Sequence, residues 1–274
     1  MGVLNATPDS FSDGGLHLDL DAARARVGQM LAEGAAWIDV GGESTRPGAE
    51  PVPLREELRR VVPVVEAVAE DCRAAGAGLS VDTRHEQVAR AAVAAGATVV
   101  NDVSASLWPV AADLGVGWVA MHMAGDPRTM QADPRYADVV DDVRRFLADR
   151  VTQARSAGVE RIWVDPGIGF GKTTAHNLEL LGRLDELVAD GTPVLVGTSR
   201  KRFTGELLAR SDGGELRPVP DSGVVVAQRG IEPVPPEDRL VGSLATAVWA
   251  MIHGARIVRV HDVQATVRAV RALP

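Results

Sequence analysis

The amino-acid sequence predicts an α/β protein, with a single-domain (β/α)8 TIM barrel as the expected architecture. Eight short apolar runs, rich in valine and isoleucine, alternate with longer amphipathic segments along the chain. A glycine followed by alanine precedes several of these runs, as expected where a helix ends just before the next strand. The length of 274 residues suits one domain of about 250 residues, the usual size of such a barrel.

The predicted strands are short and apolar without strict alternation, which is typical of parallel strands covered on both faces. In chain order they are residues 2–5, 36–40, 78–81, 98–101, 117–121, 161–164, 193–196 and 256–260. A doubly wound open sheet is the alternative, because periodicity alone does not separate the two architectures. The number of strands and the chain length favour the barrel.

The predicted helices lie between these strands and carry apolar residues at helical spacing. In the first of them, residues 18–34, Asp19 and Asp21 stand near the positive end of the helix dipole. Gly34 is suited to end that helix, since glycine adopts the left-handed conformation that follows a last turn. The other predicted helices are residues 54–75, 86–95, 137–157, 177–189, 201–209 and 240–253.

Residues 211–237 interrupt the alternation. They contain nine glycines and prolines and a single apolar run. This composition predicts a flexible surface insertion in the barrel domain of residues 1–274, with a lid over the site as a minor alternative.

Composition excludes several classes of function. The net charge is −8 and aromatic residues are 4% of the chain, which argues against a nucleic-acid partner. Cys72 is the one cysteine, so no internal disulfide is possible and a reducing compartment fits. Since no apolar run approaches the roughly 18 residues of a membrane span and the first residues lack a secretory pattern, we expect a cytoplasmic protein with no membrane partner.

Polar residues gather at the ends of the predicted strands, where a barrel collects its catalytic side chains. They are Asn5, Asp39, Asp82, Asn101, Asp102, His122, Asp165, Arg259 and His261, with the turn Ser199-Arg200-Lys201 after the seventh strand. Each alone is compatible with a turn or a helix cap, but stability requires no such set. An ionised aspartate accepts two parallel N–H bonds, as an aminopyrimidine edge offers, and cationic groups suit phosphate oxygens. The sequence therefore predicts a site for a polar heterocycle that bears an anionic group.

The glycine-rich segment of residues 165–173 is not a nucleotide-binding motif. Three residues separate Gly167 from Gly171, whereas a phosphate-binding P-loop needs four before its Gly-Lys pair. We interpret the segment as a tight loop that lets a ligand approach the backbone.

Several motifs together resemble dihydropteroate synthases. Residues 5–15, Asn-Ala-Thr-Pro-Asp-Ser-Phe-Ser-Asp-Gly-Gly, resemble the first signature of that family, and residues 39–48 resemble the second. Further matches lie at residues 81–83, 101–104, 121–123, 165–167, 199–203 and 259–263. The matches run in order from residue 2 to about residue 270 and leave out only the predicted insertion.

The resemblance implies a (β/α)8 barrel that is usually a homodimer. It implies a transferase of folate biosynthesis that joins 6-hydroxymethyl-7,8-dihydropterin diphosphate to p-aminobenzoate, gives 7,8-dihydropteroate and pyrophosphate, and is a sulfonamide target. Mg²⁺ is the implied cofactor, contacted by Asn5. Departures from the family are the start of the chain almost on the first strand, Ala6 in place of a larger residue, and the insertion.

Site residues carry over from the resemblance position by position. Asp165, Asp82 and Asn101 resemble the residues that bind the pterin, and Lys201 resembles the lysine between the pterin and the p-aminobenzoate pocket. Arg259 and His261 resemble those that bind the pterin and its diphosphate, and Met121 is a further expected contact. Thr45 and Arg46 are expected near the diphosphate and p-aminobenzoate, and Phe11, Asp13, Pro47 and Phe170 around p-aminobenzoate. Lys201, Arg46, Asp13 and Phe11 are the implied catalytic set.

Two other functions fit the resemblance less well. One is a pterin-dependent methyltransferase, which would not need the turn at residues 199–201. The other is a relative that binds pterin without turnover. The helix-borne His85, His176 and His253 show no metal-ligand spacing and are expected to play packing or surface roles.

Overall fold

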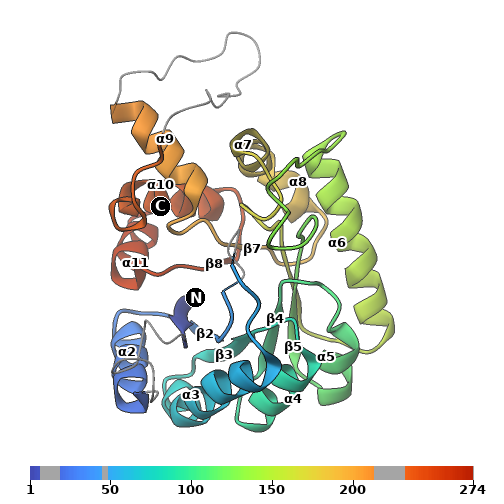
Figure 1. Ribbon diagram of the computed structural model, residues 1–274, viewed down its shortest axis with the longest axis vertical. Helices are drawn as coiled ribbons and strands as arrows, with labels where there is room; N and C mark the ends of the chain where they lie inside the picture. Colours follow the sequence, from blue (N-terminus) through green and yellow to red (C-terminus); the bar gives the residue numbers. More distant parts are fainter. Residues whose placement is uncertain (7–18, 45–48, 213–231, 274) are drawn as a thin grey trace.

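The computed structural model describes residues 1–6, 19–44, 49–212 and 232–273 (Figure 1). Within them, eight short parallel strands follow one another along the chain. These are β1 (Gly2–Asn5), β2 (Trp37–Gly41), β3 (Gly78–Asp82), β4 (Val99–Asp102), β5 (Gly117–Met121), β6 (Ile162–Asp165), β7 (Leu195–Val196) and β8 (Ile257–Val258). Each overlaps a strand predicted from the sequence.

The strands close into a barrel. β1 to β6 are hydrogen-bonded in chain order, and β7 pairs with β8. Two parallel bridges join these sheets, between Val164 and Val194 and between Gly2 and Val260. At the second bridge the Val3 N–H donates to the Val260 carbonyl at 3.0 Å. Since the last strand returns to the first, the open doubly wound sheet is excluded and the (β/α)8 barrel is confirmed.

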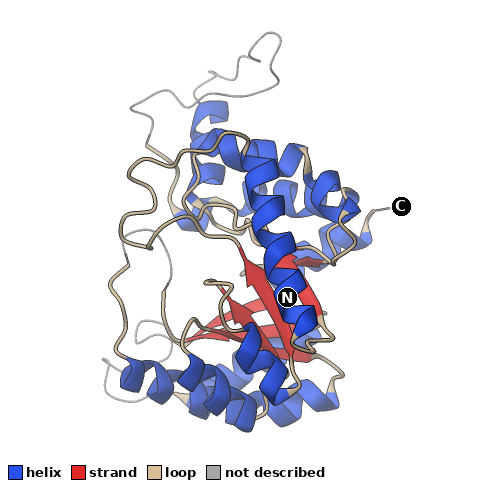
Figure 2. Cartoon of the chain, turned by 90° about the vertical axis from the view of Figure 1, so that its right-hand side faces the viewer, coloured by secondary structure: helices blue, strands red, loops and turns tan. Residues whose placement is uncertain are grey.

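Helices surround the strands, which occupy the middle of the molecule in Figure 2. They are α2 (Leu20–Ala32), α3 (Leu54–Ala74), α4 (Glu86–Ala94), α5 (Trp108–Leu114), α6 (Val139–Ser156), α7 (Thr174–Gly182), α8 (Leu184–Ala189), α9 (Arg202–Asp212), α10 (Leu240–Ile252) and α11 (Val263–Arg271), with a 3₁₀ turn at Pro236–Asp238. No helix among the described residues is long and apolar enough to cross a membrane.

Local sequence explains where these helices begin and end. Asp19 caps α2, since its carboxylate accepts from the Ala22 N–H at 2.8 Å. Gly34 follows α2 with φ +99°, and Gly96 follows α4 with φ +119°. A Cβ at Gly96 would lie 2.6 Å from the Ala69 side chain, so glycine is needed there for space as well as conformation.

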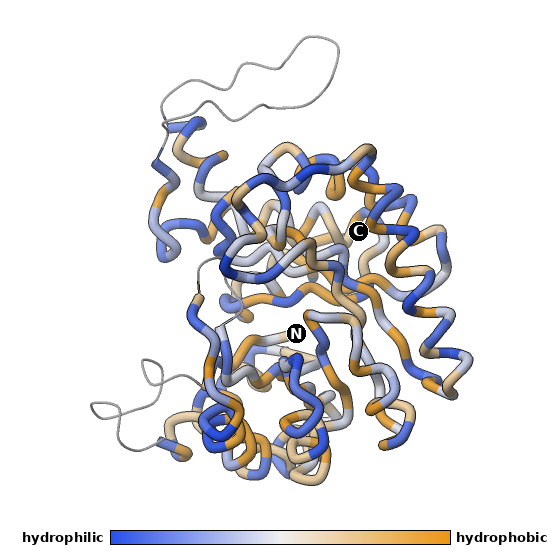
Figure 3. The backbone as a smooth tube through the Cα atoms, turned by 45° about the vertical axis from the view of Figure 1, so that its right-hand side comes forward, coloured by the Kyte–Doolittle hydropathy of each residue, from blue (hydrophilic) through white to orange (hydrophobic). Residues whose placement is uncertain are grey.

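Alternate strand residues belong to two separate cores. One set, including Val40, Val81 and Val100, packs with the helices in the large outer core. The other set forms a small cluster inside the barrel, with Val99, Val119 and Leu195 packed against Met1, Trp37, Trp163 and Ile257. The division follows from the two-residue repeat of a strand. Figure 3, coloured by residue hydropathy, shows hydrophobic and hydrophilic residues alternating along the surrounding helices.

Three elements differ from the sequence-based expectation. α5 and α11 were not predicted, and the expected helix at residues 177–189 is divided into α7 and α8 at Arg183. Of the predicted insertion, residues 211 and 212 belong to α9, and Val234 donates its N–H to the Gly205 carbonyl of α9 at 3.2 Å. Residues 213–231 lie outside the described residues.

Candidate active site

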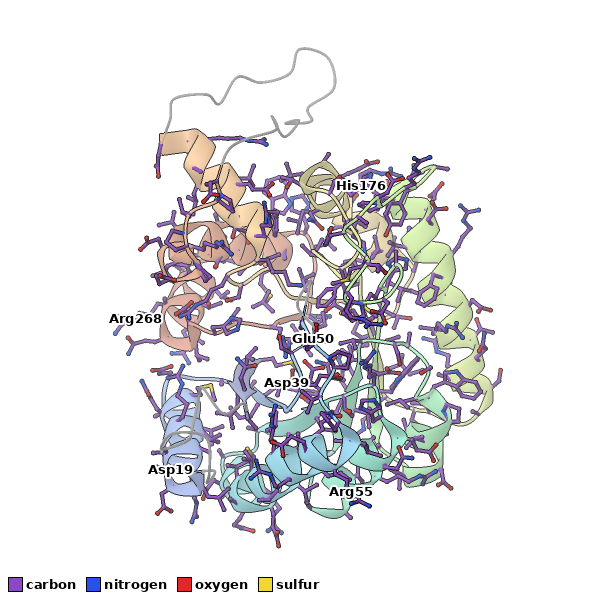
Figure 4. The ribbon with its side chains drawn as sticks, viewed as in Figure 1. Asp19, Asp39, Glu50, Arg55, His176 and Arg268 are labelled. Carbon is purple, nitrogen blue, oxygen red and sulfur yellow. The ribbon has the colours of Figure 1, made fainter. Side chains whose placement is uncertain are left out.

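A layer of polar side chains lies at the carboxyl ends of the strands, next to the apolar cluster inside the barrel. The two-residue repeat of a strand puts both sets on the same, inward face. Asp165 follows Trp163 at this spacing, and Arg259 follows Ile257. The same spacing relates Asp39 to Trp37, Asn101 to Val99 and Met121 to Val119. Figure 4 labels Asp39 near the centre of the molecule, between the lower and upper groups of helices.

Arg259 joins two carboxylates across this layer. Its Nε donates to Asp39 Oδ2 at 2.6 Å, and its Nη2 donates to Asp82 Oδ2 at 2.7 Å. Burial opposes the charge of the guanidinium, but the two carboxylates hold the pKa of Arg259 above its usual value. Burial raises the pKa of Asp82 to about 7 against the pull of Arg259, and the neighbouring Asp39 adds to the rise. The arginine therefore stays charged, while Asp82 holds its proton to a higher pH than an exposed aspartate does.

Asp39 orients the amide of Asn101. Asp39 is completely buried, and its Oδ1 accepts from the Ser80 hydroxyl. Its Oδ2 accepts from Asn101 Nδ2 at 3.0 Å as well as from Arg259. Because the amide donates to Asp39, the Asn101 oxygen is directed away from that carboxylate as a hydrogen-bond acceptor.

Asp165 is held by the loop that follows β6. It is 4% exposed, and its Oδ1 accepts from the Gly167 N–H at 2.7 Å. Burial raises the pKa of Asp165, whereas Lys201 and the Gly167 N–H act to lower it. The loop fixes one carboxylate oxygen, and a carboxylate has further lone pairs that accept the N–H groups of a heterocycle.

Lys201 approaches the same loop from the turn before α9. Its Nζ donates to the Ile168 carbonyl and lies 4.6 Å from the centre of the Phe170 ring. Burial lowers the pKa of Lys201 to about 8, and Asp165 opposes this shift. The preceding Arg200 has φ +57°, a left-handed conformation stabilised by a 2.9 Å bond from its N–H to Ser243 Oγ.

Ser199 and His261 connect the ends of β7 and β8. Ser199 Oγ lies 3.0 Å from His261 Nδ1, and the His261 N–H donates to Ser199 Oγ at 3.2 Å. Next to them, Arg200 donates to Asp262 through Nε at 3.0 Å and Nη2 at 2.5 Å. The hydroxyl and the imidazole are donors suited to phosphate oxygens at this side of the barrel mouth.

The structure brings many of the predicted site residues to one end of the barrel. Asp82, Asn101, Asp165, Phe170, Lys201, Arg259 and His261 lie at the ends of strands or in the loops after them. Asn5 ends β1 and pairs with Gly41, and Met121 ends β5 and pairs with Asp165. Phe11, Asp13, Thr45, Arg46 and Pro47 lie outside the described residues.

Glu43 anchors the loop that carries Thr45, Arg46 and Pro47. Its side chain is 4% exposed and accepts hydrogen bonds from Arg84 Nε and Nη2, each at 3.1 Å. It also accepts from the Val52 N–H at 3.1 Å, on the other side of that loop. One carboxylate therefore ties both described ends of the loop to the segment after β3.

The fold brings His85 next to two carboxylates, a grouping that sequence spacing does not reveal. Ligand atoms of Glu43, Glu57 and His85 lie within 4.8 Å of one another. The Glu57 oxygens accept from Thr83 Oγ1 at 2.7 Å and His85 Nδ1 at 2.6 Å, while Arg84 binds Glu43. Since donors already contact these carboxylates and Arg84 adds positive charge, the set suits a cation poorly.

The sequence alone did not predict the hydrogen bonds that Asp39, His122 and Lys172 form at this end of the barrel. Asp39 and His122 were recognised as strand-end residues but were not included in the site, and Lys172 was considered only within a false P-loop. Lys172 is 3% exposed, and its Nζ lies 2.9 Å from His122 Nδ1. The available signal was a lysine after three closely spaced glycines at a strand end.

Buried carboxylates beside buried cations at a barrel mouth suit a polar heterocycle with an anionic group. Comparisons with known proteins identify the family of this chain. A family model described as pterin binding enzyme matches residues 1–261. The chain belongs to the dihydropteroate synthase family. The dihydropteroate synthase of Escherichia coli (strain K12) is 43% identical over 279 residues, which cover 100% of this chain and 89% of that one.

Solved structures of this family have the same fold. The Yersinia pestis dihydropteroate synthase in complex with a sulfonamide drug has a TM-score of 0.83 at 43% identity, covering 98% of this chain and 90% of that chain. The Xanthomonas albilineans dihydropteroate synthase in complex with 7,8-dihydropteroate has a TM-score of 0.78 at 42% identity, covering 100% and 93%. The resemblance inferred from the motifs is confirmed, and so is the barrel.

Proposed function

We propose that this chain joins 6-hydroxymethyl-7,8-dihydropterin diphosphate to p-aminobenzoate, giving 7,8-dihydropteroate and pyrophosphate in folate biosynthesis. The observation that carries the proposal is the buried Asp165 carboxylate, fixed by the Gly167 N–H beside the cationic Lys201, at the mouth of a dihydropteroate synthase barrel. A buried acceptor beside a buried cation is the arrangement that a pterin ring requires, since the ring offers N–H donors and a carbonyl oxygen on one edge.

Pterin recognition is assigned to the carboxylates and amide of the barrel layer. Asp165 accepts from the aminopyrimidine edge, with Asp82 and Asn101 as the companions that bind the ring at other polar atoms. Asp39 supports this set, because it accepts from both Asn101 and Arg259. Met121, 4% exposed at the end of β5, supplies apolar contact to the flat ring.

Diphosphate binding is assigned to Arg259 and His261, with Ser199 beside them. Asn5 fits a role in holding Mg²⁺, because a carboxamide oxygen is a hard ligand and Mg²⁺ in proteins often takes only one or two protein ligands besides water and phosphate. When bound, Mg²⁺ would neutralise charge on the diphosphate as it departs. Asn5 ends β1 at the same mouth as Asp82 and Arg259, which supports this assignment.

The p-aminobenzoate side is assigned to Lys201 and Phe170, with the two signature loops. The Lys201 ammonium over the Phe170 ring supports a place for an aromatic carboxylate beside them. By the family resemblance, Phe11, Asp13, Thr45, Arg46 and Pro47 complete this wall. Closure of their loops over the reacting groups would exclude water from the methylene carbon.

The reaction is a substitution at the pterin methylene carbon. The carbon–oxygen bond to the diphosphate breaks and the leaving group keeps the electron pair, while the dihydropterin ring supports positive charge at that carbon. The amine of p-aminobenzoate forms the new carbon–nitrogen bond and releases one proton. Since a neutral arylamine is already a nucleophile, the site needs positioning and charge stabilisation more than a strong base.

Product formation from the two purified substrates tests the proposal. The expected result is one pyrophosphate for each 7,8-dihydropteroate, with neither formed when either substrate is left out. Binding of 7,8-dihydropteroate without pyrophosphate release would favour a non-catalytic relative. Transfer of a methyl group from a methylated pterin would favour the methyltransferase alternative.

Two further properties belong to this proposal. We infer a homodimer, because α10 exposes Val241 and Ile252 at 67% and 62% on one side of a predominantly apolar helix. We also infer a cytoplasmic enzyme, in keeping with its single cysteine. Since the Yersinia pestis relative forms a complex with a sulfonamide drug, a sulfonamide is expected to compete with p-aminobenzoate here.

A further inference from the structure

The loop between β6 and α7 is held by side chains that donate to its carbonyl groups. Five consecutive carbonyls each accept from a side chain: Gly167 and Phe170 from Lys172 at 3.0 and 3.1 Å, Ile168 from Lys201, Gly169 from Gln131 at 2.7 Å, and Gly171 from Tyr136 at 2.8 Å. Backbone bonds within a loop this tight satisfy few of its polar groups, so these side chains determine its conformation.

The glycines of this loop allow it to pack directly against the segment after β5. Gly167 and Gly171 have φ +66° and +64°. A Cβ at Gly167 would lie 1.8 Å from the His122 carbonyl oxygen, and a Cβ at Gly171 would lie 2.5 Å from the Ala124 oxygen. The two backbones are therefore closer than any side chain permits.

Lys172 lies inside this contact. Its Nζ is near four acceptors: His122 Nδ1 at 2.9 Å, the Gly167 and Phe170 carbonyls, and the His122 carbonyl at 3.4 Å. Within the described part of the chain, no carboxylate forms an ion pair with it. Burial lowers the pKa of Lys172 to about 7, while Asp165 opposes the shift. Burying an ammonium group costs folding free energy, so packing alone does not explain a lysine at this position.

The choice of lysine at this position is itself informative. The chain contains 29 lysine and arginine residues, of which 27 are arginines and only Lys172 and Lys201 are lysines. Both lysines donate to carbonyls of the same loop. A single nitrogen with rotatable N–H bonds can reach converging carbonyls, whereas the planar guanidinium of arginine is too large and directs its donors as a fork.

We propose that Lys172 is a positioning residue for the proposed reaction, which fixes the β6–α7 loop so that Asp165 and Phe170 are presented to the substrates. Gly167 links Lys172 to Asp165, because its carbonyl accepts from Lys172 and its N–H donates to Asp165. Phe170 is connected in the same way, because its carbonyl accepts from Lys172 while its ring lies under Lys201. Because Lys172 is only 3% exposed, its effect reaches the substrates through this loop.

The variant Lys172→Met tests the proposal, since it keeps the length of the side chain and removes its N–H groups. With Gly167 released, affinity for 7,8-dihydropteroate should fall about tenfold, the value expected for loss of a charged hydrogen bond in the site. The KM for p-aminobenzoate should rise by a similar factor through Phe170, with a smaller change in kcat. Isothermal calorimetry and steady-state rates of pyrophosphate release give these values.

Tyr136→Phe is the matched control. It removes the donor to Gly171, which belongs to the same loop but bonds to neither Asp165 nor Lys201. This variant should lose a comparable amount of thermal stability while its product affinity stays within twofold of the unchanged protein. Equal losses of affinity in both variants would overturn the proposal, because general loosening of the loop would then be sufficient.

His122→Phe supplies a second test if Lys172→Met does not fold. Phenylalanine keeps the edge-to-face contact with Phe146, at a ring distance of 5.0 Å, and removes one of the four acceptors of Lys172, the imidazole nitrogen. Product affinity should fall about threefold, and an unchanged affinity would contradict the proposal. The inference rests on the proposed function, but the two fail differently: an inactive wild-type protein rejects the function, whereas an active wild-type protein with an equally competent Lys172→Met variant rejects the positioning role alone.

Discussion

Lys201 shows how a single residue can serve the site at the expense of stability. Burial lowers its pKa from the ordinary lysine value to about 8, although its Nζ donates to the Ile168 carbonyl. A lowered pKa in the folded state means that the folded protein binds this proton less tightly than the unfolded chain does. The cost is therefore fully present below pH 8 and is relieved as the pH rises from about 8 towards the ordinary value.

Replacing Lys201 by methionine should consequently stabilise the protein at pH 7 while removing its activity. The apolar side chain avoids the desolvation of an ammonium, so thermal unfolding should move upward by a few degrees, the scale of about 1 kcal/mol in a domain of this size. The gain should shrink between pH 8 and pH 10. Differential scanning calorimetry at pH 7 and pH 10 measures the gain in unfolding temperature. A Lys201→Met variant that is less stable than the unchanged protein at pH 7 would show that the buried ammonium does not lower stability.

The same lowered pKa predicts the alkaline side of the activity profile. The kcat/KM for the pterin diphosphate should decline above pH about 8 as Lys201 loses its proton. In Asp165→Asn the residual activity should decline at lower pH, because the Asp165 charge opposes the lowering of the Lys201 pKa. Initial rates from pH 6.5 to 9.5 check both statements, and a flat profile up to pH 9.5 would exclude this role for Lys201.

Single residues were predictable from the sequence where their position in the chain was enough to define their role. Asp165 ends β6, Asn101 lies one residue before the end of β4 and Arg259 follows β8, so a barrel had to gather them at one mouth. Asp39 lies in the middle of β2, and its hydrogen bonds to Asn101 and Arg259 cross the barrel to residues 62 and 220 positions away in the chain. Lys172 was missed for the same reason, since its partner His122 comes from another strand loop.

The elements were predictable where burial imposed a repeat. All eight strands and the long helices follow from apolar patterning and from glycines with positive φ at helix ends. α5 was missed because its seven residues are too few for a periodic pattern, and its start is set by Asp102, whose carboxylate accepts from the Leu107 N–H at 2.6 Å. The α7–α8 break was missed because Arg183, which has φ −115°, is an ordinary helix former.

Arg84 connects the loop after β2 to the segment after β3 through its ion pair with Glu43. Arg84→Met leaves Glu43 buried without its cationic partner, which should cost about 1–2 kcal/mol, less than a fully buried pair because Arg84 is partly exposed. The loop with Thr45, Arg46 and Pro47 would lose an anchor, so the KM for p-aminobenzoate should rise. Urea unfolding and steady-state kinetics measure the two effects.

Arg90→Met is the control for that variant. Arg84 binds the single carboxylate of Glu43, whereas Arg90 binds two, Glu86 and Asp113, and all three of these side chains are at least 40% exposed. Water screens such pairs, so stability and KM should hardly change. If the two arginine variants behaved alike, Glu43 would not be the anchor of the loop.

In the part of the chain that the structure describes, a closed barrel is combined with an exposed apolar face on α10. β8 returns to β1 through the Gly2–Val260 bridge, which leaves no open strand edge in the described barrel for association. α10 differs, because Val241, Trp249 and Ile252 are 46–67% exposed. Trp249 also stacks on His253 at a ring distance of 4.3 Å, which keeps its face fixed.

This face should be the contact between two copies of the chain. Val241→Glu combined with Ile252→Glu should convert the protein from a dimer to a monomer, because the charges would be buried in an apolar interface. Sedimentation velocity measures the change. Leu20→Glu, at an apolar position of α2 that is 37% exposed, should leave the dimer intact, and a monomeric wild-type protein would exclude the dimer.

We propose that this barrel mouth holds a pterin through Asp165 and transfers its methylene group to p-aminobenzoate. The most direct measurement is kcat/KM for the pterin diphosphate from pyrophosphate release, compared between the unchanged protein and Asp165→Asn. Loss of a buried charged acceptor, worth about 1.5–3 kcal/mol, predicts a decrease of roughly tenfold to more than a hundredfold. Asp126→Asn, at an exposed carboxylate, serves as the control. An Asp165→Asn variant as active as the control would exclude Asp165 as the residue that binds the pterin.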